Sequence, residues 1–96
     1  MQVTKTDELT TPAVQLVIAA LNEEEGIGLT IAEMKDILGD ISVLVVDGKS
    51  TDKTVELARN MGAQVICQDG TGKGDALAKA LQHLDANANY VILTDA

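Results

Sequence analysis

The chain has 96 residues and a hydrophobic content of 46%, which allows one domain and excludes an intrinsically disordered protein. Its formal net charge of −8 argues against nucleic acid as the main partner, and no apolar run is long enough to span a membrane. With a single cysteine, Cys67, and no apolar leader at its start, it is expected to be a cytoplasmic protein without an internal disulfide.

Runs of aliphatic residues alternate with amphipathic segments along the chain. This alternation predicts an α/β fold, a Rossmann-like parallel sheet of about four strands joined by right-handed helical crossovers. Residues 1–13 are polar and without period, so we expect a flexible tail ahead of one domain at residues 14–96. The predicted strands are residues 14–20, 41–46, 64–67 and 90–94, and the predicted helices are about residues 23–38, 52–61 and 75–84.

Residues 43–46 (VLVV) give the strongest signal in the sequence. A continuous apolar run fits a strand that is buried on both faces, as the middle of a parallel sheet requires. Asp47 follows at the carboxyl end of this strand, where open α/β sheets bind ligands. Gly48 permits a tight exit, and Ser50 or Thr51 can cap the next helix.

Acidic or polar groups also follow the first and fourth strands, at Asn22, Glu23 and Asp95. Asn22 is a good N-cap, and the glutamates after it suit the positive end of a helix dipole. Because parallel strands end at one edge of a sheet, these groups and Asp47 can bind ribose hydroxyls, base N–H groups or a cation that bridges phosphates. The alternative is that they only cap helices and close turns.

The segment at residues 70–75 (GTGKGD) invites comparison with a phosphate-binding P-loop, but its spacing excludes that motif. Cys67 stands where the first glycine should be, and Gly74 stands where serine or threonine should follow Lys73. Lys73 and the backbone N–H groups of this segment can still contact a pyrophosphate. A flexible turn with a solvated lysine is the alternative.

Periodicity also predicts the core-facing residues of the helices. Cys67, within a strand, is interpreted as a core residue. The first helix is expected to bury Ile27, Ile31, Met34 and Leu38, and the third Leu77, Ala80, Leu81 and Leu84.

Several short motifs occur together in one order: residues 20–24 (ALNEE), 45–48 (VVDG), 50–52 (STD) with Thr54, 62–63 (GA), 72–74 (GKG) with 76–77 (AL), and 95–96 (DA). Each is weak alone, but the ordered set over residues 14–96 resembles the nucleotide-binding half of family-2 glycosyltransferases of the GT-A fold. The most similar members are dolichyl- or polyprenyl-phosphate sugar synthases and glucosyl-3-phosphoglycerate synthases.

This resemblance implies transfer of a sugar from a nucleoside diphosphate donor to a polyprenyl phosphate or a small phosphorylated acceptor, with Mg²⁺ or Mn²⁺ as cofactor. It implies that the full-length protein works at the cytoplasmic face of a membrane. It further implies that Lys73 lies near the phosphates and that Asp95, as the first acid of a DxD motif, touches ribose or metal. The nucleoside pocket would be lined by Ala20, Asn22 and Glu23, with Glu23 and Asp47 on base or ribose.

The sequence departs from the family's pattern at three places. Ala19 stands where many members have proline, and Lys49 occupies a position that is usually small or polar. The second acid of the DxD motif would be position 97, so we expect a fragment of a longer chain that is catalytically inactive by itself. In such a fragment the fourth strand exposes an apolar edge, which predicts a homo-oligomer.

Two other functional classes compete with the glycosyltransferase hypothesis. A receiver-like signalling domain would need paired acids after the first strand and a phosphorylatable aspartate after the third. Here the first strand ends in residues 20–22 (ALN), and Asp69 lies beside a glycine-rich segment, so that match is poor. A nucleotide-binding module without catalysis is the other alternative.

Overall fold

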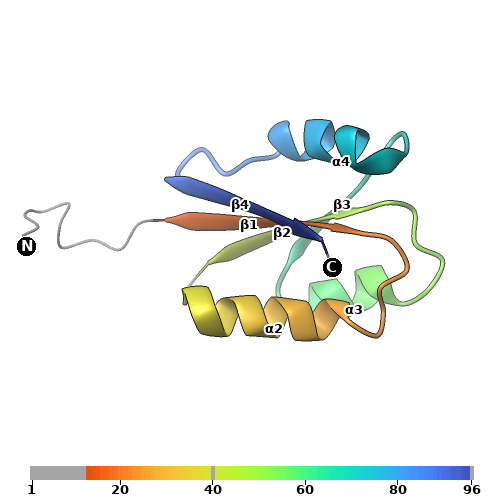
Figure 1. Cartoon of the computed structure of the whole chain (residues 1–96), viewed down its shortest axis with the longest axis horizontal. Coiled ribbons are helices and arrows are strands. Elements are labelled where there is room, and N and C mark those ends of the chain that lie inside the picture. The colour runs from red at the N-terminus through yellow and green to blue at the C-terminus, as the bar shows by residue number, and fades with distance from the viewer. Residues whose placement is uncertain (1–12, 40, 96) are drawn as a thin grey trace, which may run out of the picture.

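The computed structural model describes residues 13–39 and 41–95. All four strands lie in one parallel sheet of order β3-β2-β1-β4, with α2 and α3 on one face and α4 on the other (Figure 1). This architecture confirms the predicted α/β class. The elements are β1 (Val14–Ala20), α2 (Ile27–Leu38), β2 (Ser42–Asp47), α3 (Thr54–Asn60), β3 (Gln64–Cys67), α4 (Gly72–Leu81) and β4 (Tyr90–Asp95).

The order of the strands reverses beside β1. Successive strands run from β1 through β2 to β3 on one side, and β4 then pairs with the other side of β1. In this register Ala20 lies beside Asp47, and Ala19 lies beside Asp95. The ends of β2 and β4 therefore flank the end of β1, as expected for a ligand crevice at a topological switch point.

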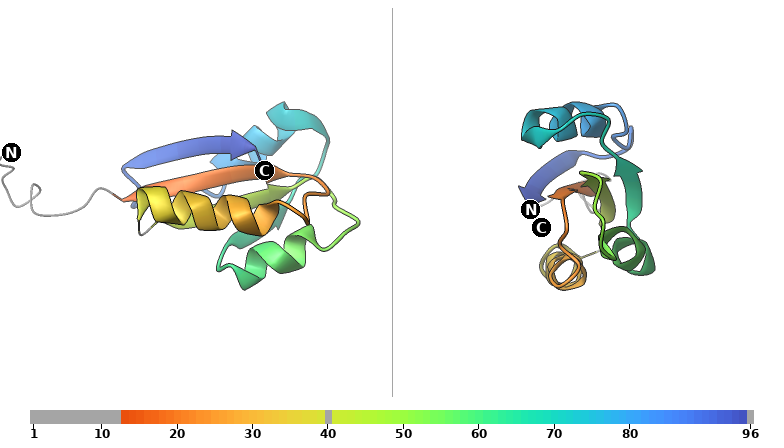
Figure 2. Two further views of the ribbon diagram at one scale, coloured as in Figure 1. Left: turned by 60° about the horizontal axis from the view of Figure 1, so that its bottom comes forward. Right: turned by 90° about the vertical axis from the view of Figure 1, so that its right-hand side faces the viewer.

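The core has two layers, one on each face of the sheet, and the views in Figure 2 show the sheet between its helices. β1 and β2 are buried on both faces, which confirms the interpretation of the VLVV run as a central strand. The layer under α2 and α3 contains Leu16, Ile18, Ala20, Ile27, Ile31, Val43, Val45, Ala58 and Ala63. The layer under α4 contains Val17, Leu44, Val46, Ala76 and Ala80.

The predicted inner face of the third helix is partly wrong. Ala80 is buried and Leu84 packs against the core, as expected, but Leu77 and Leu81 are exposed. The helix turns Ala76 and Ala80 to the sheet, and such small side chains let it approach closely. Cys67 is also exposed rather than buried, because it ends β3 at the edge of the sheet.

The helices begin at other residues than the sequence predicts. α2 starts at Ile27 and has no acidic residue in its first turn, so Asn22 is not its N-cap. Asn22 has a φ of 52°, whereas a capping residue is extended. α4 starts at Gly72, so residues 72–74 form a first helical turn instead of a loop.

The predicted flexible tail at residues 1–13 lies almost entirely outside the described residues. Residues 1–12 and Ala96 are among those not described, and Ala13 is bonded to Asn89 through backbone and side chain. We find no candidate membrane-spanning helix within residues 13–39 and 41–95.

Two isoleucines of α2 provide a test of this packing. Ile31 is fully buried against the sheet, whereas Ile37 is 74% exposed on the same helix. We expect Ile31→Ala to lower the free energy of unfolding by about 2–5 kcal/mol in urea denaturation, and Ile37→Ala to change it by less than about 1 kcal/mol. Equal losses for the two variants would contradict the position of α2.

Candidate functional site

The loops after β1 and β2 are joined by hydrogen bonds at the carboxyl edge of the sheet, where the strands end. The Asn22 backbone N–H donates to Ser50 Oγ, and the Thr51 N–H donates to Asn22 Oδ1, each over 2.8 Å. The Glu23 N–H donates to Thr54 Oγ1 over the same distance. Asn22 thus holds the neighbouring loop in place instead of capping its own helix.

Asp47 lies at the centre of this network and is only 2% exposed. Its two carboxylate oxygens accept hydrogen bonds from the Ser50 backbone N–H over 2.9 Å and from Ser50 Oγ over 2.5 Å. Because Ser50 Oγ also accepts from the Asn22 backbone N–H, one chain of hydrogen bonds runs from the Asn22 backbone through the Ser50 hydroxyl to the Asp47 carboxylate. Each oxygen of the Asp47 carboxylate therefore has one partner within the protein, and the carboxylate fixes the turn after β2.

Asp52 organises the start of α3. Its carboxylate accepts hydrogen bonds from the backbone N–H and hydroxyl of Thr54 and from the Glu24 N–H. Desolvation pushes the pKa of Asp52 upward, but these hydrogen bonds outweigh it and hold that pKa below its usual value. Asp52 acts here as a turn residue.

A cavity of about 320 Å³ opens beside this network, between the end of β1 and the start of α4. Of the predicted site residues, Ala20, Glu23, Lys73 and Asp95 line it together, whereas Asn22 and Asp47 hold the adjoining loops. Gln68 and Thr71 line it as well and were not predicted. The only signal for Gln68 is that it follows β3 directly, in the way that Asn22 and Glu23 follow β1.

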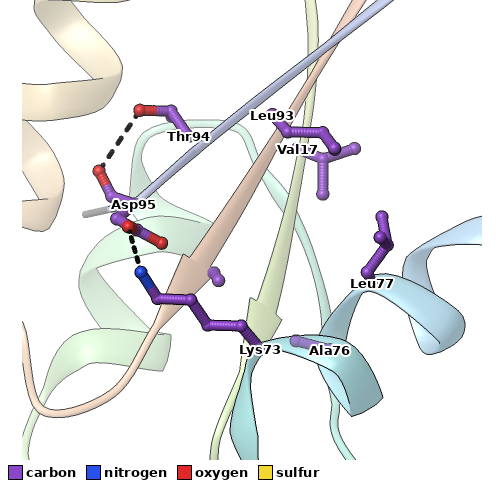
Figure 3. Close-up of a pocket in the computed structure, with 8 residues that line it drawn as sticks. Val17, Lys73, Ala76, Leu77, Leu93, Thr94 and Asp95 are labelled. Carbon is purple, nitrogen blue, oxygen red and sulfur yellow. Dashed lines mark hydrogen bonds and ion pairs between the residues drawn. The ribbon is translucent and has the colours of Figure 1, made fainter.

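Lys73 and Asp95 form an ion pair across the mouth of the cavity, with 2.8 Å between Lys73 Nζ and Asp95 Oδ2 (Figure 3). The hydrogen bond that Lys73 donates to the Asp95 carboxylate, together with the negative charge of that carboxylate, raises the pKa of Lys73. Both side chains are more than half exposed, so water screens this pair and a ligand can compete for either partner. On its other side the pair borders an apolar cavity of about 270 Å³, lined by Val17, Leu77 and Leu93.

The segment between β3 and α4 is held from both sides. The Gly70 N–H donates to Asp75 Oδ2 over 2.9 Å, and Lys79 Nζ lies 3.0 Å from Asp69 Oδ2. Lys49 has a φ of 71°, which lies in the left-handed region that residues other than glycine rarely adopt. Its Nζ donates a hydrogen bond to the Asp69 carbonyl over 3.0 Å. These bonds orient the first turn of α4, where Lys73 lies.

The residues around the cavity can supply some, but not all, of the ligands of a divalent cation. Among the residues that the structure describes, no group of three His, Cys, Asp or Glu side chains could hold a metal by itself. Mg²⁺, however, is commonly bound by one or two carboxylates together with substrate phosphates and water. Asp95, with Glu23 on the same cavity, fits such a partial site, and its metal role stays a prediction.

Two glycines of this segment differ sharply in their surroundings. A Cβ on Gly70 would lie 2.8 Å from Asp75 Oδ1, whereas a Cβ on Gly74 would have nothing within 4 Å. We expect Gly70→Ala to lower the free energy of unfolding by about 1–3 kcal/mol through this overlap. Gly74→Ala should raise it by about 0.5 kcal/mol, because alanine favours the helix.

Urea denaturation of the two glycine variants checks this expectation. A Gly70→Ala protein as stable as Gly74→Ala would mean that Asp75 does not hold the loop as described.

The family model described as "Glycosyl transferase family 2" matches residues 15–96. Similar proteins from Haloferax volcanii are the glycosyltransferase AglJ, 42% identical over 87 residues, and a dolichyl-phosphate hexose transferase, 39% identical over 89 residues. These alignments cover 90% and 92% of this chain but only 28% and 38% of the relatives' own lengths.

Solved structures agree with the sequence comparison. Glucosyl-3-phosphoglycerate synthase from Mycobacterium tuberculosis, in complex with Mn²⁺, UDP and glucosyl-3-phosphoglycerate, superposes with a TM-score of 0.74 and 28% identity. The match covers 88% of this chain and 33% of that one. The predicted resemblance is thereby confirmed, and the four-stranded sheet corresponds to part of a GT-A fold. The chain belongs to glycosyltransferase family 2.

Proposed function

We propose that this chain binds a nucleoside diphosphate sugar, as the donor-binding part of a glycosyltransferase that transfers the sugar to another molecule. One observation carries the proposal. Groups from three separate parts of the chain line a single cavity at the switch point of the sheet: Glu23 after β1, Lys73 on α4 and Asp95 at the end of β4. Carboxylates accept hydrogen bonds from hydroxyl and N–H groups, and a lysine donates charge-assisted hydrogen bonds to phosphate.

In this proposal the site residues have different roles. Ala20 and Glu23 line the nucleoside part of the cavity, and Lys73 contacts the diphosphate. Asn22 and Asp47 hold the wall of the nucleoside pocket, and an Asp47 oxygen can accept one more hydrogen bond from base or ribose. Asp95 would hold a Mg²⁺ or Mn²⁺ ion, and the positive charge of that ion would screen the charge that develops on the leaving group.

The acceptor and setting are proposed from the relatives. Their names include a dolichyl-phosphate hexose transferase and a glucosyl-3-phosphoglycerate synthase, which supports a polyprenyl phosphate or a small phosphorylated acceptor. Because a polyprenyl phosphate is a membrane lipid, we also propose that the full-length protein works at the cytoplasmic face of a membrane. We also propose that residues 14–96 are the donor-binding domain and that residues 1–96 alone do not catalyse sugar transfer. The support is that the chain spans less than two fifths of the length of these relatives.

Lys73 is the residue whose removal tests donor binding. We expect Lys73→Ala to weaken UDP binding about tenfold in calorimetry with Mn²⁺ present, since it removes one charge-assisted contact. Lys53→Ala is the control, because Lys53 is also exposed but lies at the start of α3, away from the cavity. Equal affinities of Lys73→Ala and the unmodified chain would exclude the proposed phosphate contact.

We further propose that the chain forms homo-oligomers through β4. This strand ends the sheet in the described region, and it exposes Tyr90, Val91 and Leu93. Val91 and Leu93 lie on the face of the sheet that α4 covers, and the exposed Leu77 and Leu81 on α4 extend the apolar surface on that face. An edge strand with apolar neighbours pairs readily with a second copy, which buries both.

A charge on β4 tests this association. Leu93→Lys should convert an oligomer into a monomer in light scattering, because it places a cation at the proposed interface. Leu29→Lys on α2 is the matched control, since Leu29 is comparably exposed on the opposite helical layer and should leave the mass unchanged. A monomeric mass for the unmodified chain at high concentration would contradict the proposal.

A further inference from the structure

Gln68 is a buried polar residue of the cavity that the proposed roles do not use. It is 7% exposed and follows β3, where its backbone N–H donates to the Asp47 carbonyl over 2.8 Å. This bond extends the pairing of β2 and β3 by one residue. Alternation along the strand then turns the Gln68 side chain to the same face as Ile66, which α4 covers.

The amide group of Gln68 holds the first turn of α4. Its Nε2 donates to the Gly72 carbonyl over 2.8 Å. Gly72 has a φ of 84°, a conformation that favours glycine, and Lys73 follows it directly. The hydrogen bond therefore fixes the backbone from which Lys73 reaches Asp95 across the cavity mouth.

The carbonyl oxygen of the same side chain faces the cavity beside Gly48. A Cβ on Gly48 would lie 3.4 Å from Gln68 Oε1, and both residues line the cavity. No described residue donates a hydrogen bond to this oxygen. A buried acceptor without a donor is unfavourable, so a ligand that donates a hydrogen bond to this oxygen binds more tightly. Phosphates accept hydrogen bonds, whereas ribose hydroxyls and base N–H groups can donate them.

We propose that Gln68 is a binding and positioning residue of this cavity. Its Oε1 accepts a hydrogen bond from the nucleoside, and its Nε2 positions Lys73 for the diphosphate through Gly72. This inference rests on the proposed nucleotide function and adds to it a residue that couples recognition of the nucleoside to recognition of the phosphates.

Calorimetry with UDP and UMP on one variant and its control tests both roles. Gln68→Met keeps the length of the side chain and removes both hydrogen bonds. We expect its affinity to fall about tenfold for UDP and about threefold for UMP. The variant then prefers UDP over UMP less strongly than the unmodified chain does. Gln64→Met should leave both affinities unchanged, because Gln64 is exposed at the other end of β3.

The outcomes separate this inference from the function on which it rests. A folded Gln68→Met protein with unchanged affinities overturns the inference, and an equal fall for UDP and UMP overturns the positioning role. If the unmodified chain binds neither nucleotide, the proposed function fails and the binding role fails with it.

The positioning role also has a readout that needs no ligand. Nitrogen-15 relaxation should give lower order parameters for Gly72 and Lys73 in Gln68→Met than in Gln64→Met, since the bond to Gly72 is lost. Equal order parameters overturn that role. If Gln68→Met does not fold, Gln68→Asn, which is too short to reach Gly72, is expected to give the same results.

Discussion

The pairing of β1 with strands on both of its sides is the constraint on which the rest of the structure depends. β1 is buried against β2 and β4, and the parallel register brings the ends of all three strands to one edge. Since the crossover through α2 and the crossover through α4 lie on opposite faces of the sheet, these two helices diverge at the end of β1. The cavity lies in the gap that this divergence leaves, as in other open α/β sheets.

The walls of the cavity are organised by side chains that bond to neighbouring loops. Asn22, Ser50 and Asp47 connect the loops after β1 and β2, and Lys49 and Gln68 connect the segment before α4 to its surroundings. Such bonds order the loops before any ligand binds, which lowers the entropic cost of binding. Lys73 and Asp95 differ from these residues, because their side chains are exposed and, within the part of the chain that the structure describes, they pair with each other. The fixed groups therefore shape the pocket, and this exposed pair is free to rearrange around a ligand.

Sequence reasoning predicted the strands well and the starts of the helices poorly. The bounds predicted for the strands at residues 14–20 and 64–67 match those of the structure, because a run of aliphatic residues directly indicates a buried strand. Asn22 was misread as a helix cap, since its partner Thr51 lies 29 residues away and no local pattern reveals that bond. Leu77 and Leu81 were assigned to the core because periodicity alone cannot show that α4 packs through Ala76 and Ala80. The ordered motifs identified the family correctly, whereas Gln68 carried no motif and needed the fold to bring it to the cavity.

The proposed function requires that one cavity at the carboxyl edge of the sheet binds the nucleotide of a sugar donor. The most direct measurement is a nuclear magnetic resonance titration of the amide signals with UDP in the presence of Mg²⁺. We expect the largest shifts from the cavity and its walls, at Glu23, Gly48, Gln68, Lys73 and Asp95. Residues at the opposite edge, such as Gln15, Ser42 and Gln64, should not shift. An absence of shifts at high UDP concentration, or shifts centred on that opposite edge, would contradict nucleotide binding in this cavity.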